Sequence, residues 1–307
     1  MSALAGTPGS ASIGLIAATP AATHDGGEAI AAAGGAVAGP LDVAAAAGGI
    51  AAIDHARVIL VEAGGADPAL LEALLDRVAA WQAAGGVAVI VFDGAQLDLV
   101  AAAMLGGRSQ LLCEPGPAER VAALMLALAQ TASPGPGRVR EEGPEGESER
   151  LKRLNEEVAR IAEVLARLSR GEGRAGALGD RRLGYAPEAD DGPIAPGEIR
   201  AAIRTRRLRD QFFEAGLFED PAWDMLLDLF AAALEGQRVS VSSLCIAAAV
   251  APTTALRWIG RMTDLGLFAR EPDPLDRRRA FMRLSDRALL AMRGYWLAVR
   301  RSAGPAL

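Results

Sequence analysis

Histidine, cysteine and lysine are scarce in this sequence, and each scarcity excludes a class of site. Only 2 His occur among 307 residues. Because His24 and His55 lie in different segments, the sequence does not favour a zinc site or a Ser-His-Asp triad. Cys113 and Cys245 lie in apolar surroundings far apart, a pattern typical of buried thiols in a reducing compartment and not of a disulfide. Since Lys152 is the only lysine, arginine carries the basic charge.

Long hydrophobic runs are also absent. Gly or charge interrupts every apolar stretch before the roughly 18 residues that a membrane span needs. The first twenty residues hold no Lys or Arg, unlike the start of a secretory signal. No Walker loop and no G-x-G-x-x-G after a strand occurs. We therefore expect a cytoplasmic protein that has no membrane partner, no cofactor and no metal, and that is not an enzyme.

Charge is divided unevenly along the chain. Residues 1–137 hold 12 acidic and 4 basic side chains, whereas residues 198–307 hold 13 acidic and 17 basic ones, against a net charge of -6 for the whole. The front is therefore acidic and the back basic, which favours a polyanionic partner for the back.

The front of the chain alternates apolar runs with alanine-rich helical stretches. Four continuous runs, ended by Gly, Pro or acid, are typical of buried parallel strands; they span 12–18, 56–65, 87–94 and 109–115. Between them, Asp67 and Pro68 mark the start of an amphipathic helix that ends at Gly85. Residues 37–49 add a further strand and helix with weaker signals. Strands alternating with helices predict a parallel α/β sheet.

A Pro-, Gly- and Glu-rich segment follows, and then a heptad pattern. Residues 133–149 have too little apolar content to fold and are predicted as a linker. The next apolar side chains recur at spacings of 3 and 4, the seam of a short coiled coil. They are Leu151, Leu154, Val158, Ile161, Leu165 and Leu168. Self-pairing with a second copy is the leading interpretation, and packing on one of the chain's own domains is the alternative.

The C-terminal third reads as helices and a hairpin. A basic helix begins near Pro196, and a second is capped by Asp220 and closed by Gly236. A third follows over 240–250, and a fourth is predicted to begin with Thr253 or Thr254 as its N-cap. The core face of this fourth helix is expected to carry Leu256, Ile259, Met262 and Leu265. Leu267–Arg270 and Ala280–Leu284 then form strands around a charged turn. A helix-turn-helix followed by a hairpin is a winged helix.

This segment resembles the MarR-type winged-helix domain. The resemblance covers about residues 198–301 and rests on the wing turn and the cap of the last helix. The matching residues are Asp273, Pro274, Asp276, Arg277, Leu284, Ser285 and Asp286. It implies double-stranded DNA as partner, with the fourth helix in the major groove and the wing tip over the minor groove. It also gives the first and last helices to a dimer interface, for which Phe212 and Phe213 are suited.

The residues predicted to touch DNA lie on the third and fourth helices and on the wing. They are Ser242, Thr253, Thr254, Arg257, Arg261, Arg277, Arg278 and Arg279. Arg257 is the first choice for a base edge, since a guanidinium binds guanine O6 and N7 together. On the wing, Arg278 and Arg279 are assigned to DNA and Arg277 to the turn itself. The alternative is a solvated helix face, and Trp258 is left open between phosphate and core.

The front domain resembles a response-regulator receiver in the order of its elements. That resemblance implies an acidic pair after the first strand, a phosphorylated Asp after the third and a Lys near the end of the fifth. This sequence has no acidic pair there, ends the third strand in Glu62, and has Glu114 where the Lys would precede Pro115. The departures predict a pseudo-receiver that cannot hold Mg²⁺ or accept phosphate. A lone Asp93 after a strand is expected to cap the next helix.

Together these patterns predict a multidomain, dimeric bacterial transcriptional regulator associated with the nucleoid. The expected layout is a receiver-like or flavodoxin-like α/β domain (1–132), a linker (133–149), a coiled-coil helix (150–170), a second linker (171–196) and a MarR-like winged helix (197–307). The front domain is expected to contact protein or support dimerisation. Two alternatives stay open: a scaffold whose winged helix binds protein, and a small-molecule sensor built on the α/β sheet.

Overall fold

The computed structural model describes residues 11–53, 55–132, 192–214 and 216–302, which all belong to one compact unit. The predicted coiled coil, with Leu151, Leu154, Val158, Ile161, Leu165 and Leu168, lies outside the described residues.

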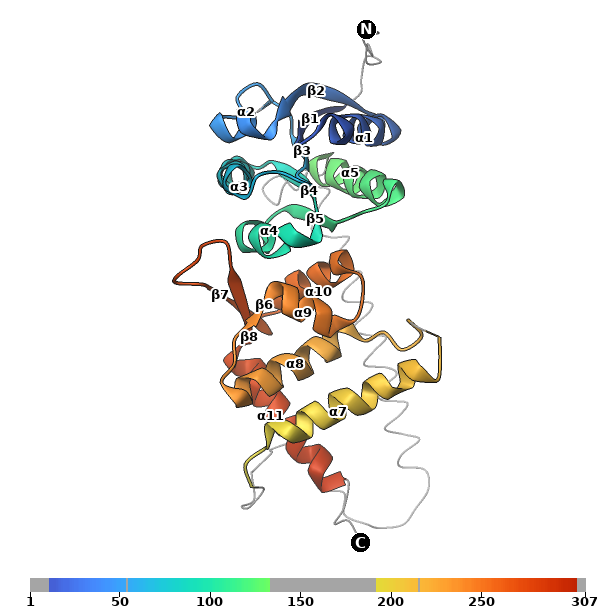
Figure 1. The fold of residues 1–307 in the computed structure, drawn as a ribbon, viewed down its shortest axis with the longest axis vertical. Helices are drawn as coiled ribbons and strands as arrows, with labels where there is room; N and C mark the ends of the chain where they lie inside the picture. The colour runs from blue at the N-terminus through green and yellow to red at the C-terminus, as the bar shows by residue number, and fades with distance from the viewer. Residues whose placement is uncertain (1–10, 54, 133–191, 215, 303–307) are drawn as a thin grey trace, which may run out of the picture. The chain divides into compact units, whose positions relative to one another are not determined.

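The front of the chain forms a five-stranded parallel sheet, as predicted (Figure 1). The strands are β1 (Ala11–Ala17), β2 (Gly35–Asp42), β3 (Val58–Glu62), β4 (Val87–Phe92) and β5 (Ser109–Cys113). Their order is β2-β1-β3-β4-β5, that of flavodoxin-like doubly wound sheets. The segment with weaker signals does contribute a strand and a helix. The central strands β3 and β4 are buried over their whole length, which explains their uninterrupted apolar sequence.

Helices cover both faces of this sheet (Figure 1). They are α1 (Pro20–Ala32), α2 (Val43–Gly48), α3 (Pro68–Ala83), the short η1 (Gly94–Gln96), α4 (Leu97–Met104) and α5 (Pro117–Ala132). Residues of α1 and α5 share one apolar cluster with the sheet, whereas those of α2, α3 and α4 share the other. Asp67 caps α3 by accepting hydrogen bonds from the backbone N–H of Ala69 and Leu70, so this predicted helix start is confirmed.

The back of the chain has the element order of a winged helix. It comprises α7 (Pro196–Leu208), η2 (Arg209–Gln211), α8 (Pro221–Glu235), β6 (Val239–Ser240), α9 (Val241–Ala248), α10 (Pro252–Asp264), β7 (Phe268–Pro272), β8 (Ala280–Leu284) and α11 (Asp286–Ser302). Strands β7 and β8 pair antiparallel, and β6 joins β8 from the other side. Pro272 is tolerated because β7 is an edge strand. As predicted, Asp220 caps α8 and Gly236 ends it with a left-handed φ of 67°.

Two local predictions on α10 were wrong. The N-cap is Ala251, with Pro252 at the first helical position, so neither Thr253 nor Thr254 caps the helix. Proline suits that first position because it lacks the N–H that would go unpaired there, and the helix therefore begins before the threonines. Leu265, expected on the core face, is 53% exposed because the helix has ended at Asp264.

Ion pairs hold α7 to its neighbours. Arg200 pairs with Asp228 and Glu235, while Arg206 and Arg207 both reach Asp224. Most of the basic side chains that could have reached phosphates from α7 are therefore occupied within the chain. At the start of α7, hydrogen bonds from Arg300 and Trp296 on α11 hold the pKa of Glu198 down to about 2.

No single helix in the described ranges is long and apolar enough to cross a bilayer. Helices α9 and α10 are long and apolar enough for a span only when they are counted together, and they are bent by 108° relative to each other.

Candidate nucleic-acid interface

Helix α10 and the wing both carry exposed arginines. Arg257 and Arg261 are one turn apart on α10, and the turn between β7 and β8 adds three more in succession. The full set is Arg257, Arg261, Arg277, Arg278 and Arg279. The spacing on the helix keeps its two guanidinium groups on one side while Leu256, Ile259 and Met262 are buried on the other. Such a surface can bind a polyanion.

Asx turns shape the wing tip. Asp273 accepts a hydrogen bond from the backbone N–H of Leu275, and Asp276 accepts one from that of Arg278. The side chain of Arg279, not that of Arg277, lies nearest to Asp276, at 3.7 Å. Within the described ranges Arg277 has no hydrogen bond or ion pair, so the predicted assignment of Arg277 to the turn does not match this geometry.

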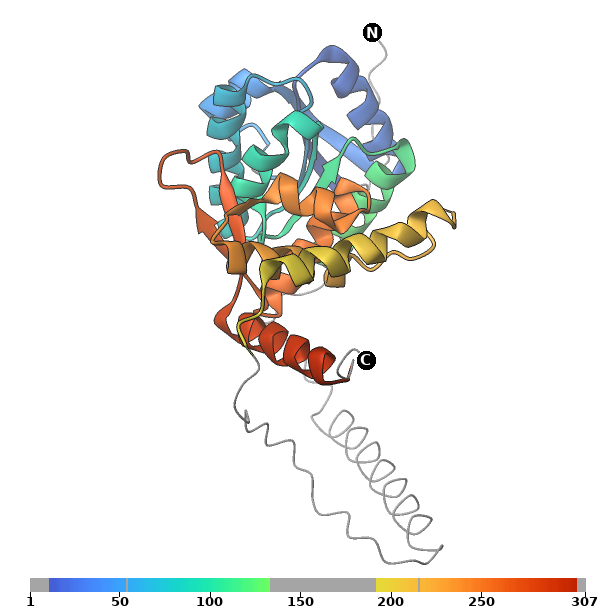
Figure 2. The same cartoon turned by 60° about the horizontal axis from the view of Figure 1, so that its bottom comes forward.

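The α/β domain occupies part of this surface (Figures 1 and 2). Thr253 is buried, and its Oγ1 accepts a hydrogen bond of 3.0 Å from the backbone N–H of Cys113 at the end of β5. Asp98 of α4 accepts hydrogen bonds from both the backbone N–H and the hydroxyl of Ser242, at 2.9 and 2.8 Å. Two residues predicted to face DNA therefore face the α/β domain.

The wing makes the same kind of contact. Arg278 Nε lies 2.8 Å from Glu72 Oε2 on α3. Arg270, at the base of the wing, donates a hydrogen bond of 3.3 Å to the carbonyl of Leu105 after α4. Glu72 and Asp98, both acidic side chains from the front of the chain, thus bind the basic back. Sequence reasoning missed them as site residues, and the only signal that points to them is the opposite charge of the two halves.

A cavity of about 620 Å³ separates the rest of α10 from α4 and β5. Thr254, Arg257 and Arg261 line it from α10, and Ser109 and Gln110 line it from β5. Half-buried Trp258 packs against the core, with the guanidinium of Arg261 5.1 Å from the centre of its ring. The cavity is therefore bordered by Thr254, Arg257 and Arg261, whereas Thr253 is buried against the end of β5.

Both cysteines are buried beside this contact and are not bonded to each other. Burial, with smaller effects of the nearby Asp98 and Cys113, raises the pKa of Cys245 to about 12. Burial also raises the pKa of Cys113. These thiols are consequently protonated and shielded in the arrangement described.

The receiver-like positions are committed to structural contacts. Glu62 is 3% exposed, and its Oε1 lies 3.1 Å from Arg120 Nε on α5. Burial raises the pKa of Glu62, and Arg120 partly offsets that rise. Asp93 caps η1 as predicted by accepting from the N–H of Gln96, and Glu114 accepts from that of Gly94. In the described ranges, no group of three or more His, Cys, Asp or Glu could hold a metal ion.

The predicted dimer residues near α7 are exposed. Phe212 is 77% exposed and Phe213 56%. Phe213 packs edge-to-face on Phe218, whose ring also lies under Arg209. An aromatic cluster of this kind at the surface is a feature of interaction sites.

No protein-family model and no curated protein matches this chain, but solved structures do. A crystal structure of MarR is 21% identical, covering 34% of this chain and 72% of its own with a TM-score of 0.23. Heme-free PefR is 12% identical, covering 36% and 93%, with a TM-score of 0.24. The PcaV transcriptional regulator from Streptomyces coelicolor, solved with its natural ligand, is 18% identical, covering 38% and 79%, with a TM-score of 0.23. Each of these matches covers about a third of this chain.

Proposed function

We propose that the chain is a dimeric transcriptional regulator that binds double-stranded DNA through its winged helix. The observation that carries this proposal is that both α10 and the wing tip carry exposed arginines. In this proposal α10 enters the major groove, where Arg257 and Arg261 meet base edges. The wing arginines lie over the minor groove and its phosphates. The α/β domain is a pseudo-receiver that contacts protein and performs no chemistry.

DNA recognition is tested with full-length protein on a randomised duplex library, followed by titration of the selected site. Arg257→Ala should weaken the selected site roughly 10- to 100-fold and relax its base preference at one position. Arg279→Ala should instead weaken all sequences and reduce the salt dependence by about one phosphate contact. Fluorescence anisotropy at several salt concentrations measures both.

Arg57→Ala is the matched control, because Arg57 is exposed just before β3 in the α/β domain and its side chain has no hydrogen bond or ion pair in the described ranges. It should bind like the wild type. Equal losses in all three variants would show that only net charge matters and would contradict the assignment of α10 to base recognition.

Dimerisation is proposed through the aromatic cluster near α7, together with the heptad segment at 150–170. Two-fold pairing would set the α10 helices about one DNA turn apart and predicts a pseudo-palindromic site. Phe212→Ala with Phe213→Ala should shift the sedimentation coefficient towards that of a monomer at micromolar concentration. Leu275→Ala is the control, since Leu275 is 94% exposed on the wing. An unchanged dimer in the double variant would place the interface elsewhere.

A second candidate is a winged helix that binds protein. The observation in its favour is that Ser242, Thr253 and Arg278 already contact the α/β domain. Steep loss of binding with added salt is the signature of phosphate contacts. A chain that ignores DNA even in dilute buffer would favour this candidate instead.

A further inference from the structure

The surface proposed for DNA and the surface bound by the α/β domain overlap. Thr253 and Ser242, at the starts of α10 and α9, each form hydrogen bonds with the front domain, and Arg278 on the wing pairs with it through its Nε. In groove binding, the start of the recognition helix is the part that approaches the base edges. A duplex and the end of β5 cannot both lie against Thr253.

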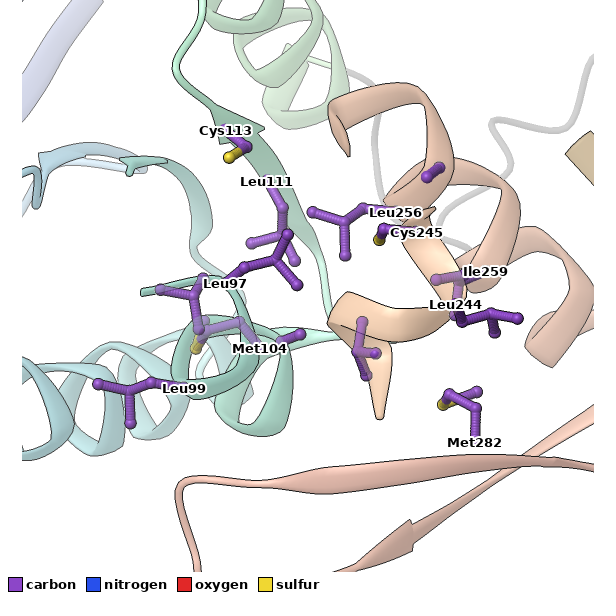
Figure 3. Packing of buried hydrophobic residues seen from close by; sticks show 14 of the residues in the cluster. Leu97, Leu99, Met104, Leu111, Cys113, Leu244, Cys245, Leu256, Ile259 and Met282 are labelled. Carbon is purple, nitrogen blue, oxygen red and sulfur yellow. The ribbon is translucent and has the colours of Figure 1, made fainter. Parts of the chain in front are cut away.

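The contact between the α/β domain and the winged helix also buries apolar side chains, in addition to these hydrogen bonds. Figure 3 shows Leu111 of β5 facing Leu256 of α10, with Cys245 of α9 beside Leu256. All belong to one continuous buried cluster that runs from the sheet into the winged helix. Burial of this surface favours the closed arrangement, and opening it would expose the cluster to water.

Charge reinforces the contact. Asp98 and Glu72 present carboxylates to a backbone N–H, a hydroxyl and a guanidinium, the groups that elsewhere bind phosphate oxygens. The front of the chain is acidic and the back basic. The α/β domain thus offers the winged helix the same chemistry as a DNA backbone.

We propose that the α/β domain is a competitor of DNA within the same chain, and that the described arrangement is a closed state that excludes a duplex. This inference rests on the proposed function and adds its regulation: DNA binds only when the winged helix separates from α4 and β5. The apparent association constant for DNA is then the intrinsic constant of the open form multiplied by the fraction of open molecules. Whatever stabilises the separated form raises that fraction.

The test weakens the contact from the α/β side only, so that no proposed DNA-binding residue changes. Glu72→Ala with Asp98→Ala removes the partners of Arg278 and Ser242. Because hydrogen bonds to charged groups are the stronger ones, this variant should bind the selected duplex about tenfold more tightly or better. The matched control is Asp25→Ala with Asp76→Ala. It removes the same charge from exposed side chains on α1 and α3 that form no hydrogen bond in the described part of the chain.

A second readout follows opening without DNA. Cys113 and Cys245 are buried at the contact, so a thiol reagent should label them slowly in the wild type and in the control. Labelling should be at least several-fold faster in the double variant. Leu111→Asp, which places a carboxylate in the apolar contact from β5, is a second opening variant in case the loss of two hydrogen bonds is too mild.

Each combination of results decides between the two proposals. Faster labelling with tighter DNA binding supports closure. Faster labelling with unchanged, measurable DNA affinity overturns closure and leaves the proposed function intact. Faster labelling with no DNA bound at low salt by any form overturns the proposed function. Labelling that stays slow in both opening variants shows a permanent contact, and that too overturns a closed state that opens.

Discussion

Replacing Arg120 with alanine is expected to lower the free energy of unfolding by about 3 kcal/mol at pH 8, because it strands a buried carboxylate. Glu62 ends β3 and is 3% exposed, and Arg120 is the cation beside it. The end of β3 therefore holds a structural ion pair.

The loss should shrink as the pH falls. Burial raises the pKa of Glu62 above its ordinary 4.5 in the folded chain, and removing Arg120 raises it further. A carboxyl with a raised pKa favours the folded state most below pH 4.5 and disfavours it as the pH rises through the folded-state value. Urea unfolding of Arg120→Ala at pH 5 should thus show a clearly smaller loss than at pH 8.

Two variants check this account. Glu62→Gln combined with Arg120→Ala removes the charge and should be more stable at pH 8 than Arg120→Ala alone. Arg77→Ala, at an exposed position on α3, should change stability by less than about 0.5 kcal/mol. A loss in Arg120→Ala that is the same at both pH values would mean that packing, and not the Glu62 charge, is responsible.

Phe230→Ala is expected to cost about 3 to 5 kcal/mol, the range for truncating a fully buried phenylalanine. Phe230 lies on α8 with no exposed surface, in the cluster that joins α8, α9, α10 and β8. The substitution removes apolar contacts and leaves a cavity that close-packed neighbours refill only in part. Urea or thermal unfolding followed by circular dichroism measures the effect.

Phe212→Ala is the matched comparison, since it deletes the same atoms from a side chain that is 77% exposed. In a dilute sample its cost should stay near 0.5 kcal/mol. Similar losses for the two phenylalanines would contradict the assignment of α8 as the centre of the winged-helix core.

The sequence by itself determined where the strands and helices lie and which face of a helix is apolar. Uninterrupted apolar runs such as Val87–Phe92 identified buried parallel strands, because strands covered on both faces need no polar alternation. Asp67 and Asp220 identified helix starts, because capping is a local interaction of a side chain with the next turn. The wing followed from two apolar strands around an Asp-rich turn, and periodicity alone divided α10 into an apolar and a basic face.

Only the tertiary structure decided which partners these elements meet. Thr253 fits a local capping rule, yet its hydroxyl binds Cys113, 140 residues earlier. Ser242 fits a phosphate contact, yet it binds Asp98, 144 residues earlier. Glu62 ends a strand, where the sequence resemblance to a receiver would imply a phosphoacceptor, yet it pairs with Arg120 of α5, 58 residues later. Periodicity and capping report interactions within a few residues, whereas these contacts arise from the docking of two surfaces whose match in shape and charge no local pattern records.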